Sequence, residues 1–237
     1  MSETRLKSKA RTYIAANVPK VFFIAFLYVL LTTLILQFSF SLINFIGREE
    51  FLDRIETGEL ISFSMLFTTF STVGLILALV LNILRPLANA GFISYCMKLH
   101  RCKETNYKDL FDGFAVLGKV FSIFIISSLL IIFWSLFFIF PGIVATYKYR
   151  QAYYILFDDP KKSARQCIRE SSYLMKGNKI DLFILDFSFI GWHILNIIFI
   201  VATQLPFLFP LLSIWIYPYV GMTRVGFYEE RVKNLAT

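Results

Sequence analysis

The sequence predicts an all-α, polytopic membrane protein with six transmembrane helices and amphipathic interfacial helices on the cytosolic side. Hydrophobic residues make up 57% of the 237 residues and charged residues only 17%, whereas about a quarter of an ordinary soluble domain is charged. Several uncharged runs exceed the about 20 residues that a helix needs to cross hydrocarbon. Lys and Arg are concentrated in alternate loops, as the positive-inside tendency predicts.

The first half of the chain begins with a basic helix, predicted over residues 2–17 at the membrane interface. The first span follows at about 19–46. An acidic loop, 48–59, leads to a second span at about 62–84, and the same helix continues to Lys98. These elements place the N-terminus in the cytosol.

The second half supplies four more spans, predicted at about 120–140, 143–157, 181–203 and 207–228. A tight turn at Pro141-Gly142 joins the third span to the fourth. Because the remaining loops are alternately basic and very short, the C-terminus is also expected in the cytosol. The whole chain, 1–237, is therefore expected to form one multi-pass domain of a cytoplasmic membrane.

The segment 161–176 is strongly amphipathic. At 100° per residue its basic side chains occupy about a third of the helix circumference, and they are Lys161, Lys162, Arg165, Arg169 and Lys176. Such a helix is expected to lie in the interface with its basic face toward anionic headgroups. Alternatively, its apolar face packs on the protein's own spans, and the two arrangements are compatible.

Polar side chains inside spans are costly and tend to be paired or functional. Asp186, Arg150 and Arg224 share a depth on three spans, which predicts an interhelical ion pair. The candidate ligand-binding set is cationic overall: Arg85, Asn89, Lys148, Arg150, Asp186, His193 and Arg224. The alternatives are that the ion pair only fixes packing and that the arginines extend to the cytosolic interface.

A weak internal repeat accompanies these spans. Three times a cytosolic helix with an aromatic residue leads to a small residue or Asn, then to Lys and an apolar span. The copies are Tyr13-Asn17-Lys20, Phe114-Gly118-Lys119 and Tyr173-Asn178-Lys179. The repeat predicts three helical hairpins around a common centre.

Catalytic, metal and cofactor motifs are not found in the sequence. The two histidines accompany no recognisable nucleophile, and Cys96, His100 and Cys102 have no second pair to complete a metal site. We therefore expect no enzyme activity and no cofactor. The net charge of +8 lies in segments assigned to the cytosol, which indicates anionic lipid as a partner and not nucleic acid.

The sequence resembles a known family in the stretches Tyr173–Lys179 and Asp186–Trp192, which are Y-L-M-K-G-N-K and D-F-S-F-I-G-W. They are similar to the signature of an uncharacterised family of bacterial integral membrane proteins. Its members are distantly similar to the membrane domain found beside some glycerophosphodiester phosphodiesterases. Pro141-Gly142-Ile143 and Phe227-Tyr228-Glu229-Glu230 also match. The resemblance implies six spans and a bacterial membrane but supplies no active site.

Two functional hypotheses follow from these observations. In the first, the protein binds or translocates an anionic lipid or amphiphile through a basic intramembrane cavity. In the second, it is a non-catalytic interaction protein, for example an assembly, stress-response or immunity partner of another membrane protein, or a homo-oligomer.

Overall fold

The computed structural model describes residues 3–33, 35, 72–203 and 209–236. These residues form helices and turns and no strand, which confirms the all-α class. The chain divides into two compact units, one made of Met1–Val29 with Leu87–Thr237 and the other of Leu30–Pro86. The acidic loop and much of the first two predicted spans lie outside the described residues. The elements discussed below lie wholly or partly in the first unit, and α4 and the helix Lys20–Thr33 extend into the second.

The N-terminal helix α1 (Glu3–Ala16) confirms the predicted basic helix. A short turn separates it from the helix Lys20–Thr33, and the chain bends there by 102°. The side-chain amide of Asn17 donates to the carbonyl of Tyr13 at 2.9 Å and closes the end of α1. The long C-terminal helix α12 (Phe209–Ala236) packs along α1.

Helix α4 (Thr72–His100) is followed by the 3₁₀ helix η1 (Tyr107–Phe111) and the short helix α5 (Asp112–Ala115). The backbones of α4 and η1 approach closely at Gly91, where an added Cβ would lie 1.7 Å from the carbonyl oxygen of Leu110. Only glycine fits where two backbones approach in this way.

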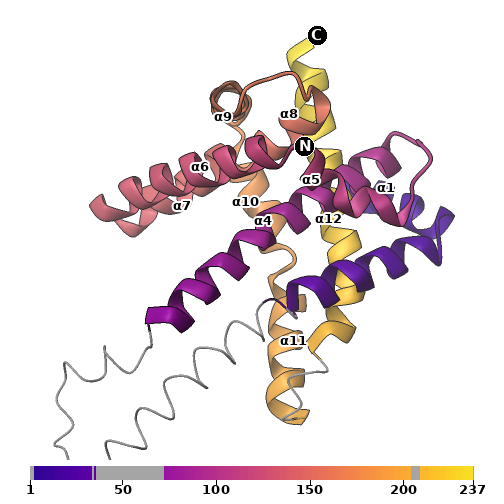
Figure 1. The fold of residues 1–237 in the computed structure, drawn as a ribbon. Coiled ribbons are helices and arrows are strands. Elements are labelled where there is room, and N and C mark those ends of the chain that lie inside the picture. Colours follow the sequence, from indigo (N-terminus) through magenta and orange to yellow (C-terminus); the bar gives the residue numbers. More distant parts are fainter. Residues whose placement is uncertain (1–2, 34, 36–71, 204–208, 237) are drawn as a thin grey trace, which may run out of the picture. The chain divides into compact units, whose positions relative to one another are not determined.

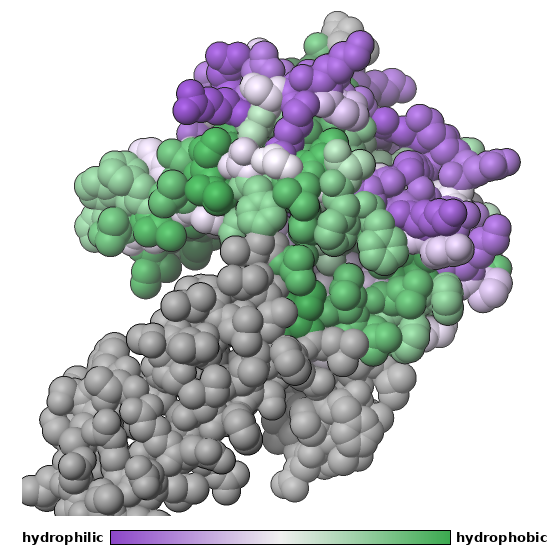
Figure 2. Space-filling view, in the orientation of Figure 1, coloured by the Kyte–Doolittle hydropathy of each residue, from purple (hydrophilic) through white to green (hydrophobic). Residues whose placement is uncertain are grey.

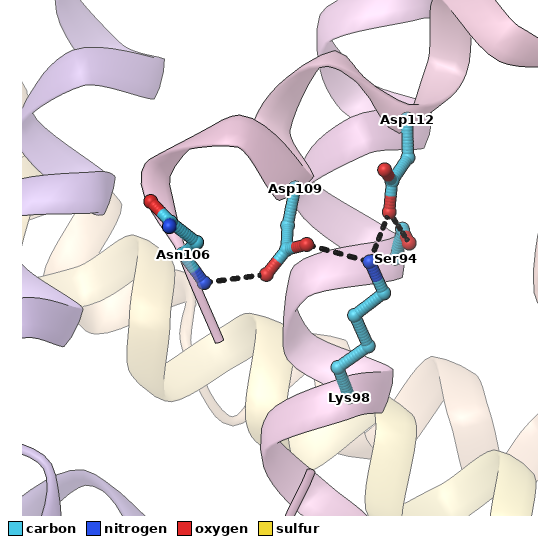
Figure 3. A network of polar contacts seen from close by, with 5 residues as sticks. All are labelled: Ser94, Lys98, Asn106, Asp109 and Asp112. Carbon is cyan, nitrogen blue, oxygen red and sulfur yellow. Dashed lines mark hydrogen bonds and ion pairs between the residues drawn. The ribbon is translucent and has the colours of Figure 1, made fainter. Parts of the chain in front are cut away.

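A polar network fixes the loop between α4 and α5 (Figure 3). The ammonium of Lys98 lies 2.6 Å from both the Asp109 and the Asp112 carboxylates, and Ser94 donates to Asp112 at 2.6 Å. Burial alone would lower the pKa of Lys98, but the hydrogen bonds to Asp109 and Asp112 outweigh burial and raise it. The loop is therefore held to α4 by charge-assisted hydrogen bonds.

Helices α6 (Leu117–Phe137) and α7 (Ile139–Tyr149) form a hairpin (Figure 1). The prediction of a tight turn at Pro141-Gly142 is wrong. The chain turns three residues earlier, at Phe138, whose backbone is extended between the two helices. Pro141 instead lies in the first turn of α7, where no backbone N–H is needed. A Cβ on Gly142 would lie 2.0 Å from Ser135 Oγ, so this glycine lets the two helices approach.

The fourth predicted span, 143–157, is not one helix. It breaks at Arg150-Gln151 into α7 and α8 (Ala152–Asp158). The hydroxyl of Ser171 donates to the carbonyl of Lys148 at 2.8 Å. This bond supplies a partner for a carbonyl that the break leaves without its intrahelical donor.

The amphipathic helix α9 (Ala164–Leu174) is shorter than the predicted 161–176. Ser163 caps its N-terminus and pairs with Gln166 in a capping box. After Gly177, whose φ is +80°, the chain continues as α10 (Lys179–Phe187) and α11 (Ile190–Thr203). The predicted continuous span over 181–203 is therefore divided at Ser188-Phe189.

An ion-pair cluster around Arg101 joins α4, α8 and α12. Arg101, which follows α4, lies 2.7 Å from Asp158 at the end of α8 and 2.7 Å from Glu229 on α12. Tyr228 also donates to Asp158 at 3.0 Å. Burial would lower the pKa of Arg101, but the hydrogen bonds to the two carboxylates raise it.

Polar and apolar surfaces are separated in the first unit. Figure 2 shows hydrophilic residues over α8, α9 and the C-terminal part of α12, and hydrophobic residues over the α6–α7 hairpin. Among the described helices, α6 is long and apolar enough to span a membrane, and only 11% of its most apolar window is buried. Helices α1 and Lys20–Thr33 pass the same test as a bent pair. The six-span topology remains a prediction.

Candidate functional site

The candidate site is organised by one carboxylate that binds two arginines. Asp186 on α10 accepts a hydrogen bond from Arg150 Nη1 through Oδ2 and from Arg224 Nε on α12 through Oδ1, at 2.9 Å. The Asp186 side chain is only 12% exposed. The predicted ion pair is thereby confirmed, and it includes both arginines.

Both arginines line a pocket of about 310 Å³ beside this ion pair. Residues of the helix Lys20–Thr33 and of α4, α6, α7, α8 and α12 line the pocket. Its polar lining is Tyr28, Asn89, Ser127, Ser128, Thr146, Tyr149, Arg150, Tyr153, Tyr154, Tyr217 and Arg224. Its apolar lining includes Phe92, Phe124 and Val220.

The pocket has a surplus of positive charge. No Asp or Glu is among the described residues that line it, and Asp186 is the single carboxylate bonded to the two arginines. Two guanidinium groups against one carboxylate leave a formal charge of +1 at the wall. Tyrosine hydroxyls and the Asn89 amide add hydrogen-bond donors, whereas the Ser127 and Thr146 hydroxyls donate to carbonyls of their own helices. The lining therefore suits an anion.

The structure brings together three of the seven predicted ligand residues at the pocket surface: Asn89, Arg150 and Arg224. Asp186 holds the two arginines without lining the pocket. Lys148 instead lies with its ammonium 5.2 Å from the Tyr149 ring centre. Arg85 belongs to the second unit.

His193 is exposed on α11 and does not line the pocket. On the continuous helix predicted over 181–203, His193 and Gln204 would share a face with Asp186 at helical spacing. The break at Ser188-Phe189 removes that constant 100° spacing. Gln204, placed on the same face, lies outside the described residues.

The tyrosines of the pocket wall were not predicted as site residues. Tyr149, Tyr153 and Tyr154 lie on both sides of the helix break that carries Arg150. The eight-residue sequence Y-K-Y-R-Q-A-Y-Y contains four tyrosines around Arg150. That density of amphipathic side chains is the signal that could have indicated a polar pocket.

Only two of the five basic residues predicted on one face of this amphipathic helix lie within α9. Arg165 and Arg169 are exposed on the helix, whereas Lys161 and Lys162 precede its cap and Lys176 follows its end. Lys162 pairs with Glu170 at 2.8 Å, and that hydrogen bond raises the pKa of Lys162. The apolar face, with Cys167 and Ile168, is buried against the protein's own helices.

A larger groove of about 830 Å³ lies between α1 and α12. Its wall is mostly apolar, with Val18, Phe22, Trp192 and Trp215. Arg11 is the one charged side chain among the described residues that line it, and Arg11 is stacked 5.6 Å from the Tyr219 ring centre. It offers few polar groups to orient a ligand, so the smaller pocket is the candidate site.

Comparison with known proteins identifies a family. A family model described as a protein of unknown function (DUF975) matches residues 12–235. No curated protein and no solved structure matches the chain.

Proposed function

Because the chain belongs to the DUF975 family of proteins of unknown function, we propose its function from the pocket: binding or translocation of an anionic lipid or other anionic amphiphile. The observation that carries this proposal is the surplus of positive charge where Arg150 and Arg224 face one enclosed space. No catalytic step is assigned to the protein.

A membrane location supports an amphiphile as the ligand. Helix α6 has 21 residues, which at 1.5 Å per residue is about 30 Å, the thickness of the hydrocarbon core. Large apolar side chains are exposed along it and along α7, among them Leu136, Phe137, Phe138 and Phe140. Surfaces of this kind favour lipid over water as the surrounding medium. We propose six spans with both termini in the cytosol.

The size and composition of the pocket suit a headgroup. A volume of about 310 Å³ is at the lower end of small-molecule sites. Arginine binds carboxylate and phosphate groups through two parallel N–H bonds. Asp186 takes one nitrogen from each guanidinium, so it orients both arginines while they remain net cationic.

The direct test is native mass spectrometry of the protein purified in mild detergent, followed by lipid extraction. Arg150→Gln and Arg224→Gln each remove one pocket cation, and Arg169→Gln on the exposed face of α9 is the matched control. We expect one anionic species in the wild type and in the control, and its loss from both pocket variants. Retention in every variant, or no retained species in the wild type, would overturn the proposal.

A second variant separates binding from folding. Ser128→Phe fills the pocket from α6 and leaves all three ion-paired side chains in place. We expect it to lose the anionic species while its thermal unfolding stays close to that of the wild type. If the lipid remains bound in Ser128→Phe, the pocket is not the site. An interaction with another membrane protein then becomes the leading function, with the ion pair purely structural.

A further inference from the structure

The three helices that return toward the polar side of the first unit share one short motif. It reads Asn89-x-Gly91-Phe92 on α4, Arg150-x-Ala152-Tyr153 at the α7–α8 break and Arg224-x-Gly226-Phe227 on α12. In each copy, a donor-bearing side chain is followed two residues later by Gly or Ala and then by an aromatic residue.

The small residue of each motif lies on a helix against which a short helix packs. Gly91 receives Leu110 of η1, and a Cβ on Gly226 would lie 3.3 Å from Leu6 of α1. Ala152 has no exposed surface and belongs to α8, on which α9 packs.

The packing of these short helices is cyclic. The 3₁₀ helix η1, at the start of the second copy, packs on α4 of the first copy where Leu110 meets Gly91, and α9, at the start of the third copy, packs on α8 of the second copy. The short helix of the first copy, α1, packs on the returning helix of the third, α12. From this closed order we infer that the three motifs occupy equivalent positions in a threefold internal repeat.

The first residue of each motif lines the same pocket. Asn89, Arg150 and Arg224 all face the space of about 310 Å³. Tyr28 and Ser127, which also line it, each follow by eight residues a lysine of the repeat, Lys20 or Lys119. Equivalent positions therefore supply nitrogen donors to one site from three copies of the same unit.

Resting on the proposed function, we propose that this pocket selects a phosphate monoester over a phosphate diester or a carboxylate. A monoester has three terminal oxygens and a charge of about −1.5 to −2 at neutral pH, whereas a diester has two such oxygens and a single charge. Donors from three equivalent positions match three terminal oxygens. Two of them are guanidinium groups, each with five N–H donors, of which Asp186 occupies only part.

The test compares four probes by native mass spectrometry with the full-length protein in detergent. They are dioleoylphosphatidic acid, dioleoylphosphatidylglycerol, oleate and the soluble monoester glycerol 3-phosphate. Wild type is compared with Asn89→Arg and Asn89→Asp, which replace an exposed polar side chain and so preserve the fold. We expect phosphatidic acid to bind at least about tenfold more tightly than phosphatidylglycerol. We expect Asn89→Arg to increase that ratio and Asn89→Asp to decrease it.

The outcomes separate this inference from the proposed function. Equal binding of phosphatidic acid and phosphatidylglycerol, both lost in Arg150→Gln, would overturn the monoester preference and leave anionic lipid binding intact. An unchanged ratio in both Asn89 variants would also overturn it. Binding of glycerol 3-phosphate without phosphatidic acid would support a monoester site for a soluble ligand and overturn the amphiphile. No binding of any probe would contradict both.

Discussion

The Asp186 carboxylate accepts a hydrogen bond from Arg224 at 2.9 Å on one oxygen and from Arg150 on the other. It joins α10, α12 and the α7–α8 break through a side chain that is largely buried. One carboxylate neutralises one of the two guanidinium groups and orients both toward the pocket.

The roles of these three side chains predict unequal costs of substitution. Asp186→Asn leaves two partly buried arginines without their carboxylate, which costs up to about 3–5 kcal/mol. Arg150→Gln leaves the Asp186–Arg224 pair intact, so we expect a smaller loss of about 1–2 kcal/mol. Thermal unfolding of the two purified variants measures the order. A larger loss for Arg150→Gln would show that Asp186 is not the organising group.

Close backbone contact predicts that Gly91→Ala is strongly destabilising. Its Cβ would lie 1.7 Å from the carbonyl oxygen of Leu110, so η1 must move away from α4, at a cost of about 1–3 kcal/mol. Gly118→Ala is the matched control, because nothing lies within 4 Å of its Cβ. Alanine there favours α6 by about 0.5–1 kcal/mol. Equal unfolding temperatures for the two variants would contradict the close contact.

His100 predicts a loss of stability in mild acid. Its ring packs at a tilt against the Tyr13 ring, with centroids 4.9 Å apart. Burial lowers its pKa, an effect that Lys9 and Arg101 reinforce and Glu229 opposes. The unfolded state therefore binds the proton more readily, and stability falls as pH decreases through about 6.5, the unperturbed value.

The unfolding temperature measured at pH 7.5 and pH 5.5 tests this sign. We expect a decrease in the wild type and a smaller decrease in His100→Gln, which has no imidazole to protonate. An equal decrease in both proteins would assign the effect to other groups.

The proposed six-span arrangement predicts that Cys102 and a cysteine at position 138 are accessible from opposite sides of the membrane. Cys102 is exposed, whereas Cys96 and Cys167 are buried. In intact cells we expect a membrane-impermeant maleimide to leave Cys102 unlabelled until the cells are permeabilised. In a Cys102→Ser background, Phe138→Cys at the α6–α7 turn should be labelled from outside. Labelling of the Phe138→Cys variant only after permeabilisation would show that the hairpin does not cross the membrane.

The pairing of charged side chains within apolar segments could be predicted from the sequence, whereas the positions of the helix breaks could not. The Arg150–Asp186 pair followed from charge in apolar surroundings, since a buried charge requires a partner. Breaks at Arg150-Gln151 and Ser188-Phe189 contain neither Pro nor Gly. They depend on tertiary contacts such as the bond from Ser171 to the Lys148 carbonyl. The face assigned to His193 was wrong because it assumed an unbroken helix.

The internal repeat, too, could be predicted from the sequence only in part. Aromatic, Asn and Lys spacing indicated three copies, and two of them share an asparagine that caps a short helix, Asn17 and Asn178. Asn89, Arg150 and Arg224 are equivalent because each lines the pocket and each is followed two residues later by a small residue in a packed position. Sequence spacing alone does not distinguish these positions, because the intervals between copies differ.

The measurement that tests the central claim most directly is competition between two lipids with the same chains. Wild-type protein in detergent receives equal amounts of dioleoylphosphatidylglycerol and dioleoylphosphatidylcholine, and native mass spectrometry gives the ratio bound. Because the pocket carries a net positive charge, we expect a preference for the anionic lipid of about tenfold or more, equal to 1.4 kcal/mol. The preference should fall toward unity in Arg150→Gln and Arg224→Gln. Equal binding of the two lipids by the wild type would contradict an anion-selective pocket.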